Sequence, residues 1–312
     1  MAGRIATRNA YGEALVELAE KYPELVVLEA DLAGATMTKF FADAYPERFY
    51  DCGIAECNMT GIAAGMATAG LKPFTNTFAM FAAGRAFEQV RNSIAYPHLN
   101  VKVVGSHGGI SVGEDGATHQ CIEDFALMRA LPGMLVCCPC DGHEMKLAVE
   151  ALLNYEGPAY LRLQRSVEDV FTDEIPGYHF ELGKGVTLRD GKDVAIVATG
   201  LMSDEALKAA EALKEKGIDA RVINLCTIKP LDEELVLRAA AACGRVITCE
   251  EHSVIGGLGE AVCALLSEKC PTPVRRIGVN DEFGHSGPAG ALLEQFGLCA
   301  AHIVEVAEDF CK

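Results

Sequence analysis

The stretch Val101-Lys-Val-Val-Gly-Ser-His-Gly-Gly-Ile-Ser-Val-Gly-Glu-Asp-Gly-Ala-Thr-His119 joins a strand-like run to a glycine-rich loop. Residues 101–104 are rich in valine, as in a buried strand, and five glycines follow by residue 119. Ligands of open α/β sheets bind at the carboxyl ends of the strands, and glycine lets the backbone approach a ligand closely. The stretch therefore favours an α/β fold whose binding site includes this loop.

Strand-like and helical patterns alternate on both sides of this stretch. In the first half of the chain, apolar runs at 25–28, 101–104, 134–138 and 159–163 alternate with helical spacing at 11–19, 59–68, 86–95, 122–130 and 144–154. In the second half, strands are expected at 194–198, 220–225, 246–249 and 274–279, and helices at 203–216, 233–242 and 258–268. This alternation predicts an α/β fold with a mostly parallel sheet covered on both faces.

A break between the two patterns predicts two domains. Residues 171–191 include Pro176 and Gly177 and several charges, which is typical of a linker. We expect a first domain at 1–170 and a second, smaller α/β domain at 192–312.

Composition limits the partners and the compartment. The chain has 312 residues and a net charge of −17, which would repel nucleic acid and anionic membranes. No apolar stretch approaches the ~20 residues needed to cross a bilayer, and the first residues lack the apolar core of a secretion signal. Thirteen cysteines, an odd number, fit reduced thiols. We expect a cytoplasmic protein without nucleic-acid or membrane partners, in which a small anionic ligand would need a local cluster of Arg.

Candidate chemical groups gather in the first domain. Glu56 lies in Asp51-Cys-Gly-Ile-Ala-Glu-Cys-Asn-Met-Thr60, at the head of a predicted helix rich in small residues, where an acid serves either chemistry or ordinary solvation. His107 and His119 can exchange protons with oxygen atoms near neutral pH, and Asp115 can hold their tautomer. The histidines could instead satisfy loop backbone groups. A zinc site lacks its third close ligand, so no metal site is predicted.

Two phenylalanines precede the loop. Phe78 and Phe81 are three residues apart and would share one face of a helix. Such a pair is either part of an ordinary core or a platform for a flat heteroaromatic ligand.

Five motifs resemble those of one enzyme family. Gly53-Ile-Ala-Glu56, Thr77-Phe-Ala-Met-Phe81 and Gly113-Glu-Asp-Gly-Ala-Thr-His-Gln120, in this order, resemble the pyrimidine-binding domain of transketolases. Leu225-Cys-Thr-Ile-Lys-Pro-Leu-Asp232 and Phe283-Gly-His-Ser-Gly-Pro-Ala-Gly290 resemble the transketolase C-terminal domain. The resemblance covers nearly the whole chain. The motif ending at Gln120 is the most specific, since Gly-Ile-Ala-Glu is shared with other thiamine-diphosphate enzymes.

The resemblance implies binding of the pyrimidine end of thiamine diphosphate. Glu56 would hydrogen-bond the pyrimidine ring nitrogen and favour the imino tautomer that takes a proton from C2 of the thiazolium. For this it must hold a proton at neutral pH, which burial away from water favours. Phe81, with Phe78 beside it, would stack on the pyrimidine, and Asp31 matches an acidic position near this ring. Gly84 stands where transketolases usually have Tyr.

The reaction that the resemblance implies is transfer of a two-carbon ketol unit from a ketose phosphate to an aldose phosphate. His107 and His119 would contact the sugar hydroxyls and move protons, and Asp115 would read a donor hydroxyl. Arg8 and Arg165 match positions that clamp the substrate phosphate, a role that suits the planar, paired donors of Arg.

One part of the transketolase site is missing from the sequence. Transketolases hold the diphosphate and its divalent metal, Mg²⁺ or Ca²⁺, through a Gly-Asp-Gly motif on an N-terminal domain, and this sequence contains no Gly-Asp-Gly. The resemblance therefore implies the C-terminal subunit of a split transketolase, paired with a separate N-terminal subunit that holds the metal, as an α2β2 assembly. Ala35 also stands where a phosphate-contacting Ser is common, with Thr36 as a candidate substitute.

Two other interpretations remain open. The chain could be half of another thiamine-diphosphate enzyme, such as the β subunit of a 2-oxoacid dehydrogenase or a deoxyxylulose-phosphate synthase-like protein. The His-bearing motif at 113–119 argues against the first of these. The chain could also be a non-catalytic scaffold subunit, although intact Glu56, His107 and His119 argue against that.

Overall fold

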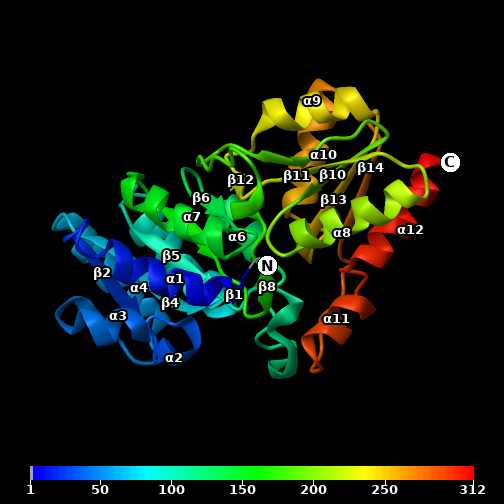
Figure 1. Ribbon diagram of the computed structural model, residues 1–312. Coiled ribbons are helices and arrows are strands. Elements are labelled where there is room, and N and C mark those ends of the chain that lie inside the picture. Colours follow the sequence, from blue (N-terminus) through cyan, green and yellow to red (C-terminus); the bar gives the residue numbers. More distant parts are fainter. Residues whose placement is uncertain (1–2) are drawn as a thin grey trace.

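The computed structural model describes residues 3–312, in which two open sheets lie side by side (Figure 1). The first sheet has seven strands in the order β12-β6-β7-β5-β4-β2-β3, and the second has five in the order β14-β13-β10-β11-β9. Most neighbouring strands are parallel. The prediction of a mostly parallel α/β fold is confirmed.

The first sheet is built mainly from the first half of the chain. Its parallel strands are β2 (Leu25–Glu29), β3 (Phe49–Asp51), β4 (Lys72–Phe78), β5 (Lys102–Ser106), β6 (Leu135–Cys137) and β7 (Ala159–Arg162). The edge strand β12 (Thr227–Lys229) comes from the second half of the chain and pairs antiparallel with β6. A tertiary contact of this kind leaves no periodic signal in a three-residue segment, so the sequence did not predict it.

Helices cover both faces of the first sheet because its strands alternate their side chains. In β2, Leu25 and Val27 pack with α1 (Thr7–Leu18), α3 (Lys39–Ala44) and α7 (Gly142–Asn154). Val26 and Leu28 face the opposite core. That core contains α4 (Glu56–Thr68), the π-helical turns η2 (Met80–Arg85) and η3 (Val90–Ala95), and α6 (Asp124–Arg129). The short helices α2 (Ala33–Thr36), η1 (Pro46–Arg48) and α5 (Phe87–Gln89) connect these elements.

The second sheet repeats the same layering. Its strands are β9 (Val186–Arg189), β10 (Val194–Ala198), β11 (Ala220–Asn224), β13 (Val246–Ser253) and β14 (Val274–Val279). Val194 and Ile196 face α8 (Met202–Glu215) and α12 (Ala300–Cys311), whereas Ala195 and Val197 face α9 (Glu233–Cys243) and α10 (Leu258–Lys269). Both helix layers are visible in Figure 1. β9 lies within the segment 171–191 that was expected to be a linker, and pairs antiparallel with β11.

Two short strands form a separate small sheet. β1 (Arg4–Ala6) pairs antiparallel with β8 (Val167–Asp169), so residues 4–6 lie against the segment that follows β7. The 3₁₀ turn η5 (Thr172–Glu174) follows.

The stretch Ala289–Cys311 departs from the expectation that no apolar segment approaches the length of a membrane span. By length and composition alone, these 23 residues could cross a bilayer. The structure divides them into α11 (Ala289–Gln295) and α12, and α12 buries Ile303, Val304 and Ala307 in the core of the second sheet. The apolar residues of this stretch therefore have partners within the chain.

Candidate active site

The predicted site residues follow the carboxyl ends of adjacent parallel strands. Asp31 follows β2, Glu56 follows β3, Phe78 ends β4, His107 follows β5 and Arg165 follows β7. These strands are neighbours in one sheet, so their carboxyl ends share one edge. This edge is where ligands bind in open α/β sheets.

Glu56 is the first residue of α4 and lies below the surface. Its exposed fraction is 2%, although its neighbours Cys57 and Asn58 are exposed. A carboxylate in the first turn of a helix is favoured by the helix dipole. Its Oε1 is 2.8 Å from an Arg85 guanidinium nitrogen, which donates to it. Sequence reasoning did not single out Arg85, because their pairing depends on how η2 folds back towards α4.

Phe78 and Phe81 form an aromatic pair, but not on one helix as predicted. Phe78 ends the strand β4, and Phe81 lies in the π-helical turn η2. The turn brings the ring centroids to 6.2 Å with an interplanar angle of 17°. The Arg85 guanidinium lies 4.4 Å from the Phe81 ring centroid. The flat guanidinium group of Arg85 thus stacks on Phe81 and is hydrogen-bonded to Glu56 at the same time.

His107 is packed between this aromatic pair and a cation. Its ring stacks on Phe78 with centroids 4.2 Å apart, and its Nε2 is 3.3 Å from a guanidinium nitrogen of Arg8. Because Arg can only donate, Nε2 accepts, and the neutral ring carries its proton on Nδ1, which lies 2.8 Å from the Ser106 hydroxyl. Burial, followed by the charges of Arg8 and Arg165, lowers the pKa of His107 to about 3. His107 therefore offers a hydrogen-bond acceptor at neutral pH.

This neutral, buried ring predicts an acid-dependent loss of stability. With a pKa of about 3 when folded and 6.5 when unfolded, His107 binds a proton only in the unfolded chain between these values. The free energy of unfolding therefore falls as the pH drops through this window. His107→Gln removes the effect, so the loss of stability between pH 7 and pH 5 should be smaller in the variant by about 2 kcal/mol. Urea unfolding at both pH values measures this, and equal losses in the two proteins would contradict it.

His119 joins the same cluster from the far end of the glycine-rich loop. Its ring meets Phe81 edge-on with centroids 5.3 Å apart, and its Nδ1 lies 2.9 Å from the Thr118 hydroxyl. Asp115 ends the 3₁₀ turn η4 (Ile110–Asp115) and is exposed. The structure therefore gathers both histidines around the phenylalanines, whereas Asp115 reaches solvent.

Arg8 and Arg165 place two positive charges near His107. Arg8 donates to the carbonyl oxygen of Ala35 over 2.9 Å, and burial together with the charge of Arg165 lowers its pKa. Arg165 is 2.8 Å from the carboxylate of Glu114. Two cations that repel each other at the edge of a binding loop are suited to an anionic ligand group.

Asp31 and Thr36 lie outside the cluster formed by the phenylalanines and histidines: Asp31 is exposed and Thr36 is buried. Asp31 is exposed, has a φ of +61°, and donates its backbone N–H to Asp51 over 3.1 Å. Thr36 is fully buried, and its hydroxyl donates to the carboxylate of Glu29 over 2.7 Å. The expectation that Thr36 could replace the missing phosphate-contacting Ser is therefore wrong, because its hydroxyl already serves the buried Glu29.

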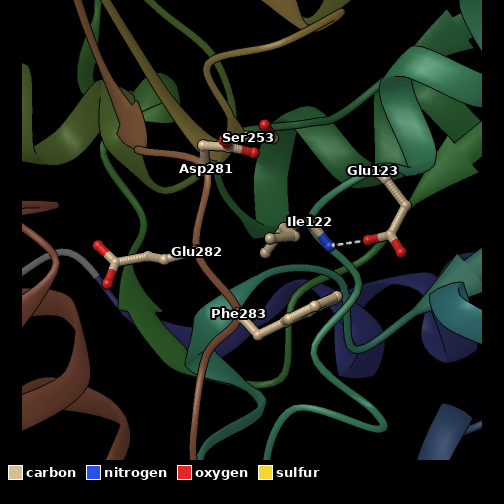
Figure 2. A pocket seen from close by; sticks show the side chains of 6 residues that line it. All are labelled: Ile122, Glu123, Ser253, Asp281, Glu282 and Phe283. Carbon is tan, nitrogen blue, oxygen red and sulfur yellow. Dashed lines mark hydrogen bonds between the residues drawn. The ribbon is translucent and has the colours of Figure 1, made fainter.

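A pocket of about 210 Å³ lies elsewhere, at the junction of the two domains (Figure 2). It is lined by Ile122, Glu123, Ser253, Asp281, Glu282 and Phe283, and contains none of the predicted site residues. Its three carboxylates make it unsuitable for a sugar phosphate. Among residues 3–312, no group of three or more His, Cys, Asp or Glu side chains is placed to hold a metal ion.

Comparison with known protein families agrees with the fold and the motifs. Residues 3–168 match the family model described as transketolase, pyrimidine binding domain, and residues 183–303 match transketolase, C-terminal domain. The chain belongs to the transketolase family. The first of these domains is the one that receives the pyrimidine of thiamine diphosphate.

Individual transketolase relatives match this chain along almost their full length. A putative transketolase C-terminal section from Methanocaldococcus jannaschii is 49% identical over 93% of this chain and 92% of its own length. A 6-deoxy-6-sulfo-D-fructose transketolase subunit from Clostridium sp. is 47% identical over 97% and 93%. A solved structure described as a split-gene transketolase, inactive β4 tetramer, is 53% identical, covers 98% of each chain, and has a TM-score of 0.90.

The transketolase cofactor fits the residues that this chain provides. The planar guanidinium of Arg85 lies between Glu56 and the face of Phe81, and an aminopyrimidine ring that bonds Glu56 and stacks on Phe81 would take the same position. Glu56 would hold the ring nitrogen, and Phe78 and Phe81 would flank the ring. The Gly-Asp-Gly motif of a diphosphate site does not occur in the sequence.

Proposed function

We propose that this chain is the pyrimidine-binding subunit of a transketolase that transfers a two-carbon ketol unit from a ketose phosphate to an aldose phosphate. One observation carries the proposal. Glu56, the phenylalanine pair, both histidines and two arginines converge at one edge of the first sheet. Thiamine diphosphate, when bound, supplies the carbon nucleophile of the reaction. Glu56 would hold a proton at the ring nitrogen of the cofactor.

The loop histidines and the arginines would handle the sugar phosphate. His107 carries its proton on Nδ1, so its Nε2 can accept a hydrogen bond from a sugar hydroxyl once Arg8 turns towards the phosphate. His119, at the rim of the aromatic pair, would donate or accept a second proton, and Asp115 would read a further hydroxyl from the solvent side. Arg8 and Arg165 would bind the phosphate.

The proposal requires a separate N-terminal transketolase subunit. That subunit would carry the Gly-Asp-Gly motif, hold the diphosphate through Mg²⁺ or Ca²⁺, and assemble with this chain as α2β2 in the cytoplasm. Two relatives support this: a structure with 53% identity that this chain covers to 98% is described as split-gene transketolase, inactive β4 tetramer, and a protein with 49% identity is described as a putative transketolase C-terminal section.

The anionic group of the sugar is a phosphate in our proposal, and a sulfonate is the alternative. The relative from Clostridium sp. is named for a sulfonated fructose. A sulfonate and a phosphate are both tetrahedral anions that offer pairs of oxygen acceptors to the planar guanidinium group, so Arg8 and Arg165 suit either. We favour a phosphate, and a direct comparison of phosphorylated and sulfonated ketoses would decide between them.

Reconstitution tests the proposed function. The chain is mixed with an N-terminal subunit that carries Gly-Asp-Gly, thiamine diphosphate and Mg²⁺, and ketol transfer from a ketose phosphate to an aldose phosphate is followed. Each subunit alone serves as a control and should be inactive. A mixture that decarboxylates a 2-oxoacid instead would favour the 2-oxoacid dehydrogenase or deoxyxylulose-phosphate synthase-like alternatives, and a mixture with no activity on either would favour a scaffold subunit.

The Arg85 contact leads to a prediction about cofactor affinity. A pyrimidine ring on Phe81 that bonds Glu56 must displace the Arg85 guanidinium, which is half exposed. A pair of this exposure is worth about 1 kcal/mol or less. Arg85→Met should therefore tighten the binding of thiamine diphosphate to the assembled enzyme by up to about fivefold. Calorimetric titration with the cofactor measures the change, and weaker binding by the variant would show that Arg85 supports the ring rather than competing with it.

A further inference from the structure

The loop that carries both histidines, residues 107–121, is held by the second domain as well as by the first; we call it the His loop. The backbone N–H of Ser111 donates to Oε1 of Glu251 over 2.6 Å. Glu251 lies on β13, in the second sheet, and is 3% exposed. A hydrogen bond from a backbone N–H to a buried carboxylate is one of the stronger kinds in proteins. The middle of the His loop is therefore attached to the C-terminal domain.

Further contacts attach the end of the His loop to the same domain. The buried amide of Gln120 donates to the carbonyl oxygen of Gly113 over 3.2 Å and to that of His285 over 3.0 Å. One residue past the loop, the Ile122 carbonyl oxygen accepts from the backbone N–H of Ser253 over 2.8 Å. Figure 2 shows Ile122 and Ser253 on facing segments at this junction.

A buried arginine joins Glu251 to the first sheet. Arg162, at the end of β7, is 2% exposed and donates to the backbone carbonyl oxygen of Glu251 over 2.9 Å. Its Nε lies 3.4 Å from the Asp124 carboxylate. Burial raises the pKa of Glu251 to about 7, and Arg162 opposes the rise. The positive charge of Arg162 therefore favours the charged form of the Glu251 carboxylate, which accepts the hydrogen bond from Ser111.

Two glycines let the His loop lie directly on this pair. A Cβ at Gly108 would collide with the Arg162 guanidinium, and a Cβ at Gly109 would collide with the Glu251 carboxylate. Gly109 also has a φ of +83°, which other residues adopt only with strain. The backbone directly after His107 is thus shaped by a side chain from the second domain.

We propose that Glu251 is a positioning residue for the sugar-binding site, which from the C-terminal domain holds the His loop so that His107 and His119 meet the phenylalanine pair. This inference rests on the proposed function. It gives the C-terminal domain a part in substrate binding in addition to packing. Glu251 touches neither histidine, so it acts through the loop backbone.

Hydrogen exchange on the full chain tests the contact without any assay of activity. Glu251→Ala removes the acceptor of Ser111, so amides at 109–113 should exchange about tenfold faster or more. Glu250→Ala is the matched control, since Glu250 is equally buried on β13 but accepts from Leu258 and Gly259 of α10. The control should leave exchange at 109–113 unchanged. Wild-type exchange of the His loop in Glu251→Ala would overturn the proposal.

Kinetics of the assembled enzyme test the consequence for the substrate. Glu251→Ala should raise the KM for the ketose phosphate about tenfold, with a smaller effect on kcat, because misplaced binding groups weaken substrate contacts. Its affinity for thiamine diphosphate should stay within about twofold of wild type, because Glu56 and Phe81 lie outside the His loop. If Glu251→Ala weakened the binding of thiamine diphosphate as much as that of the ketose phosphate, the proposal that Glu251 positions only the His loop would be contradicted. Wild-type enzyme without ketol transfer would refute the proposed function, and the exchange experiment would still decide the loop contact.

Glu251→Gln provides a second variant if Glu251→Ala does not fold. Its amide oxygen can still accept from Ser111 but lacks the charge that faces Arg162, so loop exchange and KM should fall between those of wild type and Glu251→Ala. Glu250→Gln is its control. Identical loop exchange and identical KM in these two glutamine variants would overturn the proposal.

Discussion

Glu56→Gln is expected to lower kcat for ketol transfer by about 10²- to 10⁴-fold in the enzyme assembled with its N-terminal partner. Glu56 is 2% exposed and heads α4 beside Phe81, where it can reach a ring nitrogen held on the phenylalanines. Glutamine keeps the size and hydrogen-bonding capacity of the side chain but cannot exchange a proton with that nitrogen. Turnover should therefore be lost while the assembly remains intact.

Cofactor titration and size-exclusion chromatography separate this effect from damage to the fold. The variant should bind thiamine diphosphate within about tenfold of wild type, since it loses one charge-assisted hydrogen bond and keeps the ring contacts. Glu47→Gln is a suitable control, because Glu47 is an exposed acid of η1 paired only with its neighbour Arg48. Wild-type turnover in Glu56→Gln would remove Glu56 from the proposed mechanism.

Arg8→Met and Arg165→Met are each expected to raise the KM for phosphorylated sugars by about 10- to 100-fold. The two guanidinium groups lie close enough for Arg165 to lower the pKa of Arg8, a repulsion that a bound dianion would relieve. Removal of either cation leaves the phosphate with fewer paired donors. Steady-state kinetics with a ketose phosphate and an aldose phosphate measure the change.

A substrate without the phosphate shows whether the arginines act on that group. The same ketose lacking its phosphate should react poorly with wild type and no worse with either variant. Arg91→Met serves as the matched control, because Arg91 is exposed in η3 and bonds only Asn92. If both variants lose the phosphorylated and the unphosphorylated substrate equally, Arg8 and Arg165 support the site in some way other than phosphate binding.

Much of the site could be predicted because its residues lie next to recognisable strands. The valine run at 101–104 predicted β5, and the histidine that follows it reaches the ligand edge of the sheet for that reason alone. The prediction for Phe78 and Phe81 was partly wrong. Spacing of three suggested a helix, but β4 extends to Phe78 and the π-helical turn begins at Met80. The two rings still stack, because only Ala79 separates the end of β4 from the start of η2.

Other features could not be predicted, because a local sequence pattern does not indicate which residues far apart in the chain come into contact. Arg85 follows Glu56 by 29 residues, and their ion pair forms only when η2 packs on α4. In the sequence, nothing shows that the Thr36 hydroxyl is occupied. In the folded chain it donates to the carboxylate of Glu29. β12 is three residues long and belongs to the first sheet despite its place in the second half of the chain.

The sequence by itself determined the α/β class, the transketolase family and the set of groups at the strand ends, because alternating apolar runs and fixed motifs are local properties of the chain. Tertiary structure alone decided how those groups are held. Glu251 is 140 residues from Ser111, and only the packing of the second domain against the first brings that carboxylate to the His loop. Burial then makes the contact strong, since water no longer competes for the Ser111 N–H.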